Sequence, residues 1–95
     1  MNDKSNLKNQ YNSDYVVVAL KHFNKTYGNT SHSVKVLNVK TGKTYKILDT
    51  YGYGNQYITT AKQLIKDNEN KNVNINYLNV LSVIDVNTKK ALKSL

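Results

Sequence analysis

Two stretches of the chain are almost continuously apolar, and each predicts a strand. The first runs from Tyr15 to Phe23 and is rich in β-branched residues, as is typical of a strand that is covered on both faces or lies centrally in a barrel. The second runs from Leu78 to Val86. We expect the first of these to be the most buried strand of the fold.

Shorter apolar segments between these two stretches predict a β-hairpin. Asn24 to Ser33 has the composition of a loop, and Val34 to Val39 and Lys43 to Leu48 then flank a polar turn that contains Gly42. This arrangement is typical of two antiparallel strands joined by a tight turn. The parity of the apolar positions changes within the first of the two strands, which predicts a bulge or a strong twist near Val36.

One segment has the spacing of an amphipathic helix. Its apolar positions follow the i, i+3, i+4, i+7, i+8 pattern, with polar residues on the other side; they are Tyr57, Ile58, Ala61, Leu64 and Ile65. The helix begins either at Asn55 or at the Thr-x-x-Gln capping box of Thr60 to Gln63. It ends in the polar run from Asp67 to Asn72, where Asn68 and Asn70 are good helix terminators.

The end of the chain resembles the central hairpin in sequence. Val73, Ile75 and Tyr77 alternate with polar residues and predict a short strand or an extended lead-in to the second apolar strand. The segment from Ile84 to Leu95 then repeats the residue pattern of Leu37 to Leu48, 47 residues later. We therefore expect a second hairpin, with a final strand from Lys90 to Leu95, and the sequence leaves open whether the repeat is structural.

These elements give the order β-β-β-α-β-β and an α+β fold with one helix. A small five-stranded antiparallel sheet with the helix on one face fits this order, and so does an OB-like barrel with the helix at one end. A chain of 95 residues is long enough for one core. We predict a single α+β domain over residues 14–95 and a flexible N-terminal tail over residues 1–13, which contain few apolar anchors.

The charge of the chain narrows the classes of partner. The formal net charge is +8 and the isoelectric point is near 9.7, which favours polyanionic partners. All 14 basic residues are lysine, so the bidentate arginine fork that usually reads guanine is absent. The codon bias of an AT-rich genome explains lysine in place of arginine, but it does not explain why only six residues are acidic.

The candidate binding residues are lysines and tyrosines in and around the two expected hairpins. Tyrosines among lysines can stack on unpaired bases while the ammonium groups follow the phosphates. Lysine on an exposed strand also protects a sheet edge from aggregation, and tyrosine often fills a core. The candidates are Lys35, Lys40, Lys43, Lys46, Lys89, Lys90, Lys93, Tyr45, Tyr51 and Tyr53.

The sequence gives no support to an enzyme, a metal site or a bound cofactor. There is no cysteine, and His22 and His32 do not stand in a metal-ligand spacing with a carboxylate. The acidic residues are scattered, and no nucleophile motif such as Gly-x-Ser-x-Gly occurs. The apolar runs are too short to cross a membrane, and no secretory signal is apparent. We expect an intracellular, cytoplasmic protein with no membrane partner.

Two functions fit these observations. The first is a small basic nucleic-acid-binding module that contacts the backbone and unstacked bases of single-stranded nucleic acid with low sequence specificity. The alternative is a phage-like, mobile-element-encoded inhibitor or adaptor that binds an acidic host protein through its basic surface. The two differ in whether the isolated protein retains oligonucleotides. A third class, an assembly subunit that uses exposed strand edges, is suggested only by the β content, and the sequence leaves the oligomeric state open.

Overall fold

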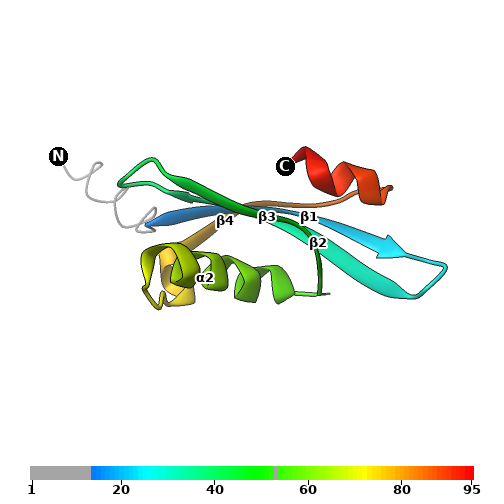
Figure 1. Cartoon of the computed structure of the whole chain (residues 1–95), viewed down its shortest axis with the longest axis horizontal. Coiled ribbons are helices and arrows are strands. Elements are labelled where there is room, and N and C mark those ends of the chain that lie inside the picture. Colours follow the sequence, from blue (N-terminus) through cyan, green and yellow to red (C-terminus); the bar gives the residue numbers. More distant parts are fainter. Residues whose placement is uncertain (1–13, 53) are drawn as a thin grey trace, which may run out of the picture.

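The computed structural model describes residues 14–52 and 54–95, which form one sheet with helices on its two faces (Figure 1). The sheet has four strands in the order β3-β2-β1-β4. β2 is antiparallel to β1 and β3, whereas β4 is parallel to β1. The elements in chain order are β1 (Tyr15–Asn24), β2 (Asn29–Asn38), β3 (Thr44–Tyr51), α2 (Gln56–Glu69), the 3₁₀ helix η1 (Ile75–Tyr77), β4 (Leu78–Asp85) and the 3₁₀ helix η2 (Lys89–Ser94). The expected tail, residues 1–13, lies outside the described residues.

The predicted fold class is wrong. The sheet is four-stranded and mixed, and it is neither a five-stranded antiparallel sheet nor an OB-like barrel with the order β-β-β-α-β-β. The direction of β4 explains the difference, because α2 carries the chain back along the sheet and a crossover of this kind joins parallel strands. A crossover through α2 fits the first five elements of the predicted order, β-β-β-α-β, as well as an antiparallel connection does.

The expected final strand, Lys90 to Leu95, is the 3₁₀ helix η2. Thr88 caps it: its Oγ1 accepts a hydrogen bond from the backbone N–H of Ala91 at 3.2 Å, which satisfies one of the free donors of the first turn. The second hairpin therefore does not form. The sequence repeat is not a structural repeat, because its first copy is a hairpin and its second copy is the end of a strand followed by a helix.

The expected loop from Asn24 to Ser33 is instead mostly strand, at the closed end of a long β1–β2 hairpin. β1 is confirmed, but β2 already begins at Asn29, so that only a four-residue turn separates the two strands. The register between β1 and β2 is unbroken, and the expected bulge near Val36 is absent. The irregularity lies in β3 instead, where Leu48 and Asp49 stand opposite Ser33. Asp49 adopts a positive φ of 57° there, which aspartate tolerates better than most residues.

The predicted helix is confirmed, in its longer version. It begins after Asn55 and ends at Asn70, which adopts the left-handed conformation typical of a C-cap. Its apolar side packs on one face of the sheet, where it forms the core together with residues from β1, β2 and β4. The buried members of this core are Tyr15, Val17, Ala19, Val34, Val36, Ala61, Ile65, Val73 and Leu78.

A carboxylate anchors the C-terminal end of α2 to the sheet. Glu69 accepts hydrogen bonds from the hydroxyl of Tyr15 at 2.6 Å, from Nδ2 of Asn38 at 2.8 Å and from the hydroxyl of Tyr45 at 2.5 Å. Burial alone would raise the pKa of Glu69, but these three bonds and the nearby charge of Lys71 outweigh it and lower that pKa to about 2. Glu69 is therefore ionised at neutral pH and ties the helix to three strands.

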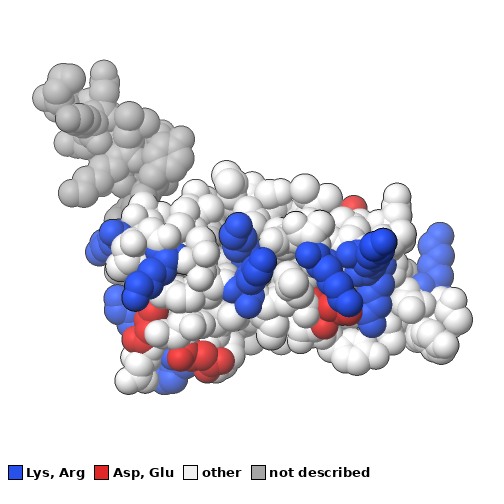
Figure 2. Space-filling view, turned by 45° about the horizontal axis from the view of Figure 1, so that its top comes forward, with Lys and Arg blue, Asp and Glu red and all other residues white. Residues whose placement is uncertain are grey.

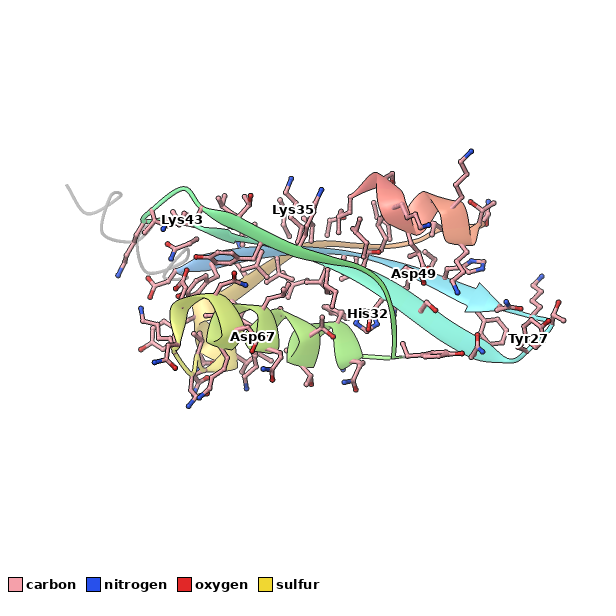
Figure 3. The ribbon with its side chains drawn as sticks, in the orientation of Figure 1. Tyr27, His32, Lys35, Lys43, Asp49 and Asp67 are labelled. Atoms are coloured by element: carbon pink, nitrogen blue, oxygen red, sulfur yellow. The ribbon has the colours of Figure 1, made fainter. Side chains whose placement is uncertain are left out.

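A buried histidine anchors the other end of α2. His32 lies between β2 and the helix (Figure 3) and is fully buried. Its Nδ1 is 3.1 Å from the carbonyl oxygen of Gly52, which can only accept, so Nδ1 carries the proton. Nε2 then accepts from the hydroxyl of Thr60 at 2.7 Å. Burial lowers the pKa of His32, and the ring is neutral at pH 7.

Replacing Glu69 with Gln tests the first anchor. The neutral amide cannot accept three hydrogen bonds as the carboxylate does, and bonds to a charged group contribute about 1.5–3 kcal/mol each. We expect the Glu69→Gln variant to be less stable than wild type by about 1–3 kcal/mol at pH 7. The measurement is urea-induced unfolding of both proteins, followed by circular dichroism.

The pH dependence gives the control for this experiment. The unfolded chain protonates Glu69 near the ordinary value of 4.5, whereas the folded chain does so only near 2. Its stabilising contribution is thus complete above about pH 4.5 and is lost as the pH falls towards 2. The stability difference between wild type and Glu69→Gln should shrink over this window. An equal difference at pH 7 and at pH 2 would contradict the anchor.

Candidate nucleic-acid interface

Residues 14–52 and 54–95 cover only part of the sheet face opposite α2. Successive residues of a strand point to opposite faces, and Val17 and Val34 point into the core against α2. Their neighbours in β1 and β2 therefore point the other way. Together with one residue of β3 they line a shallow depression, whose residues are Val16, Val18, Lys35, Leu37 and Thr44.

The helix η2 covers the other end of the same face (Figure 1). Leu92 is fully buried there, and its carbonyl oxygen accepts a hydrogen bond from Oγ of Ser33 at 2.6 Å. The same Oγ accepts from the backbone N–H of Asp49 at 2.9 Å, and the carboxylate of Asp49 forms a salt bridge with Lys89 at 3.7 Å. These contacts hold η2 beside the bulge of β3, so that no described helix lies over the end near Val16.

We call the uncovered part of this surface the open face. It comprises the five residues of the depression and Lys46 of β3. Lys46 belongs to it because it stands directly opposite Lys35 in the β2–β3 register, so that both side chains project from the same side of the sheet. Figure 3 shows Lys35 projecting on the side away from α2.

The pair of Lys35 and Lys46 places two like charges next to each other. Residues directly opposite in an antiparallel pair have Cβ atoms about 4.5–5.5 Å apart, and like charges in this position are destabilising. Among the described residues the salt bridges are those of Lys40 with Asp14 and of Lys89 with Asp49, and neither involves this pair. An anion held between the two ammonium groups would relieve their repulsion.

The structure places five of the seven candidate lysines on the open face or on the helix η2 that covers the other end of the same face, and the other two at the β2–β3 turn. Lys40 and Lys43 lie at the β2–β3 turn, Lys35 and Lys46 on the open face, and Lys89, Lys90 and Lys93 on or at the start of η2. Figure 2 shows lysine side chains in a row along one side of the molecule. Lys46 stands three positions after Lys43, and Asp49, which forms the salt bridge with Lys89, stands three positions after Lys46; at about 3.3 Å per residue the stretch from the turn to η2 measures roughly 20 Å.

The two candidate tyrosines that the structure describes lie apart from the lysines of the open face. Tyr45 lies on the α2 side of the sheet, half-buried against the core, and its hydroxyl is bonded to Glu69, so that it cannot stack on a base. Tyr51 is 72% exposed at the end of β3, and its hydroxyl accepts a hydrogen bond from Nδ2 of Asn29 at 3.1 Å. Tyr53 lies outside the described residues.

The sequence analysis missed two exposed aromatic residues near Tyr51. Phe23 and Tyr27 are exposed at the end of the β1–β2 hairpin, and Figure 3 shows Tyr27 at the tip of that hairpin. Phe23 ends the almost continuously apolar run that begins at Tyr15, a position that favours a core residue, and Tyr27 stands in a polar turn. No sequence pattern distinguished them from ordinary core and turn residues.

Other kinds of site find little support in the described part of the chain. No group of three or more histidine, cysteine or acidic residues is placed to hold a metal ion there. Nδ1 of His22 donates a hydrogen bond to the carbonyl oxygen of Val86 at 3.2 Å, because a carbonyl oxygen can only accept. No helix among the described residues is long and apolar enough to span a membrane.

Comparisons of the chain with protein-family models, with curated proteins and with solved structures found no match. The geometry and charge of the open face are therefore the basis on which a function is proposed.

Replacing Lys46 with Glu tests whether the lysine pair is under electrostatic strain. A Lys–Glu cross-strand pair would attract where the Lys–Lys pair repels, and we expect stability to rise by about 0.2–1 kcal/mol. The gain should be largest at low salt, because added ions screen exposed charges. Urea unfolding at low and high salt measures the change. Lys46→Gln is the matched control and should give a smaller gain; a loss of stability in both variants would show that the two charges do not repel.

Proposed function

We propose that this protein is a nucleic-acid-binding module that holds the sugar-phosphate backbone of a single strand along the open face and η2. The observation that carries the proposal is the Lys35–Lys46 pair, which stands over an apolar floor with further lysines on either side. Two adjacent ammonium groups without a described carboxylate partner favour binding of an anion. Retaining such a pair costs stability, and proteins tolerate this kind of local conflict chiefly at functional sites.

The row of lysines favours a linear polyanion over a small anion. Lysine groups recur at intervals of about 10 Å along the row, estimated from the strand rise. A row of roughly 20 Å matches about six nucleotides at the 3.4 Å spacing of one DNA strand, within the site sizes of single-strand-binding domains. The net charge of +8 would draw such a ligand to the protein from a distance.

The composition of the open face favours low sequence specificity. Its floor consists of Val16, Val18 and Leu37, which offer van der Waals contact to sugars and bases but no hydrogen bonds that distinguish one base from another. Lysine is a flexible point charge and does not read base edges in the bidentate manner of arginine. In this proposal the apolar floor takes the place of the tyrosine platform expected from the sequence, and Tyr51 offers an exposed ring at the end of the same strand.

The test is the salt dependence of oligonucleotide binding by wild type and by the Lys35→Gln/Lys46→Gln double variant. Each lysine that neutralises a phosphate of a single strand contributes about 0.7 to the slope of log affinity against log salt concentration. The double variant should therefore bind more weakly, with a slope lower by about 1.4. Fluorescence anisotropy with labelled oligonucleotides of several sequences measures both quantities, and we expect similar affinities for the different sequences.

A second double variant gives a matched control. Lys62 and Lys66 are exposed on α2, which packs on the opposite face of the sheet, so that Lys62→Gln/Lys66→Gln removes the same charge away from the proposed interface. This control should bind nearly as well as wild type. Equal losses of affinity in the two double variants would show that binding depends on the overall charge of the protein and not on the open face. If wild type shows no binding at low salt, the proposal fails and binding to an acidic protein takes its place.

A further inference from the structure

The strand β4 forms an apolar edge of the sheet. Of the ten large hydrophobic residues that are exposed in the described part of the chain, five lie between positions 75 and 84. Leu81 is 69% exposed and Ile84 is 53% exposed. The complete set is Ile75, Tyr77, Leu81, Val83 and Ile84. A concentration of exposed hydrophobic residues in ten consecutive positions indicates a contact surface, whereas single exposed hydrophobic residues scattered over a protein do not.

No described element covers the outer side of β4. It is the last strand of the sheet, paired with β1 alone. α2 lies against β2 and β3, and η2 lies against β1, β2 and β3, so that neither helix packs extensively on β4. The outward backbone N–H and C=O groups of a terminal strand are free to pair with another strand.

The edge also lacks the charges that usually protect such strands. No lysine occurs between Lys71 and Lys89, and Asp85 is the one charged residue of β4. The opposite edge strand, β3, carries Lys46 and Asp49. Charged side chains, lysine above all, discourage pairing between sheet edges. Such side chains occur within β3, whereas β4 has one, at its last residue.

We infer that β4 pairs antiparallel with β4 of a second copy of this chain, about a two-fold axis perpendicular to the sheet. The distribution of charge favours a second copy over an acidic partner. An acidic partner would be attracted to the lysines, which β4 lacks, whereas two copies that meet at β4 keep their lysines apart and bring together strands with Asp85 as the one charged residue. A two-fold contact uses the same patch on both copies. Leu81 stands at a register shift of β4, and Val83 and Ile84 point to opposite faces of the sheet, so that each would pack against partner residues on its own face.

The symmetry has a consequence for the two faces of the extended sheet. A two-fold axis perpendicular to the sheet leaves both α2 helices on one side and both open faces on the other. The pairing would therefore double the lysine surface on a single side of the dimer. The inference itself does not require nucleic-acid binding, and its test is made without nucleic acid.

The experiment is sedimentation equilibrium of the full chain and of single-residue variants. Wild type should approach twice the chain mass of 10.8 kDa. Added salt should strengthen the dimer, because it screens the repulsion between two strongly positive copies; this is opposite to the effect of salt on nucleic-acid binding. Leu81→Lys and Ile84→Lys each place two like charges at the paired edges, and each should weaken the dimer at least tenfold.

Val39→Lys is the matched control, because Val39 is an exposed aliphatic residue at the β2–β3 turn, away from β4. It should dimerise as wild type does. Circular dichroism checks that each variant is folded, and the exposure of Leu81 and Ile84 makes lysine compatible with the fold at both positions. A wild-type chain that stays monomeric at high concentration and high salt overturns the inference. A dimer that neither β4 variant weakens overturns it as well.

Discussion

The position of α2 depends on one carboxylate that is unfavourable by itself. Glu69 is the last residue of the helix, where the helix dipole disfavours negative charge, and partial burial disfavours it further. Donors from three neighbouring strands, Tyr15, Asn38 and Tyr45, outweigh both effects. Because β1, β2 and β3 each contribute one donor, the bonds fix the helix end across the strands. The neutral His32 holds the other end through Thr60.

The coverage of the sheet follows from this arrangement. With α2 fixed on one face, η2 is the described helix that covers the other, and a six-residue 3₁₀ helix spans about 12 Å. A ten-residue strand such as β2 spans about 33 Å. η2 is held at one end of the face by Ser33 and Asp49, so that Val16, Val18 and Leu37 stay partly exposed with Lys35 and Lys46 above them. Within the part of the chain that the structure describes, the open face exists because η2 is much shorter than the strands beneath it.

The sequence predicted the elements better than their pairing. The helical spacing of Ala61 and Ile65 and the apolar run of β1 identified two elements correctly, because each depends on local periodicity. The predicted antiparallel direction of β4 is wrong, because the order of elements along the chain does not determine how strands pair. The apparent sequence repeat predicts a strand where the structure has η2. The N-cap residue Thr88 is a local signal for the helix instead. Of the site, the lysines were recognisable from charge alone; the role of Tyr45 in the Glu69 cluster depends on contacts between residues far apart in sequence.

The claim that the open face is the binding surface is tested most directly by nuclear magnetic resonance. An isotope-labelled sample of the full chain is titrated with a short oligothymidylate, and the backbone amide shifts are followed residue by residue. The account predicts the largest changes at Val16, Lys35, Lys46 and the residues of η2, with little change along the exposed side of α2 at Lys62 and Lys66. Changes confined to α2, or no changes at low salt, would contradict it.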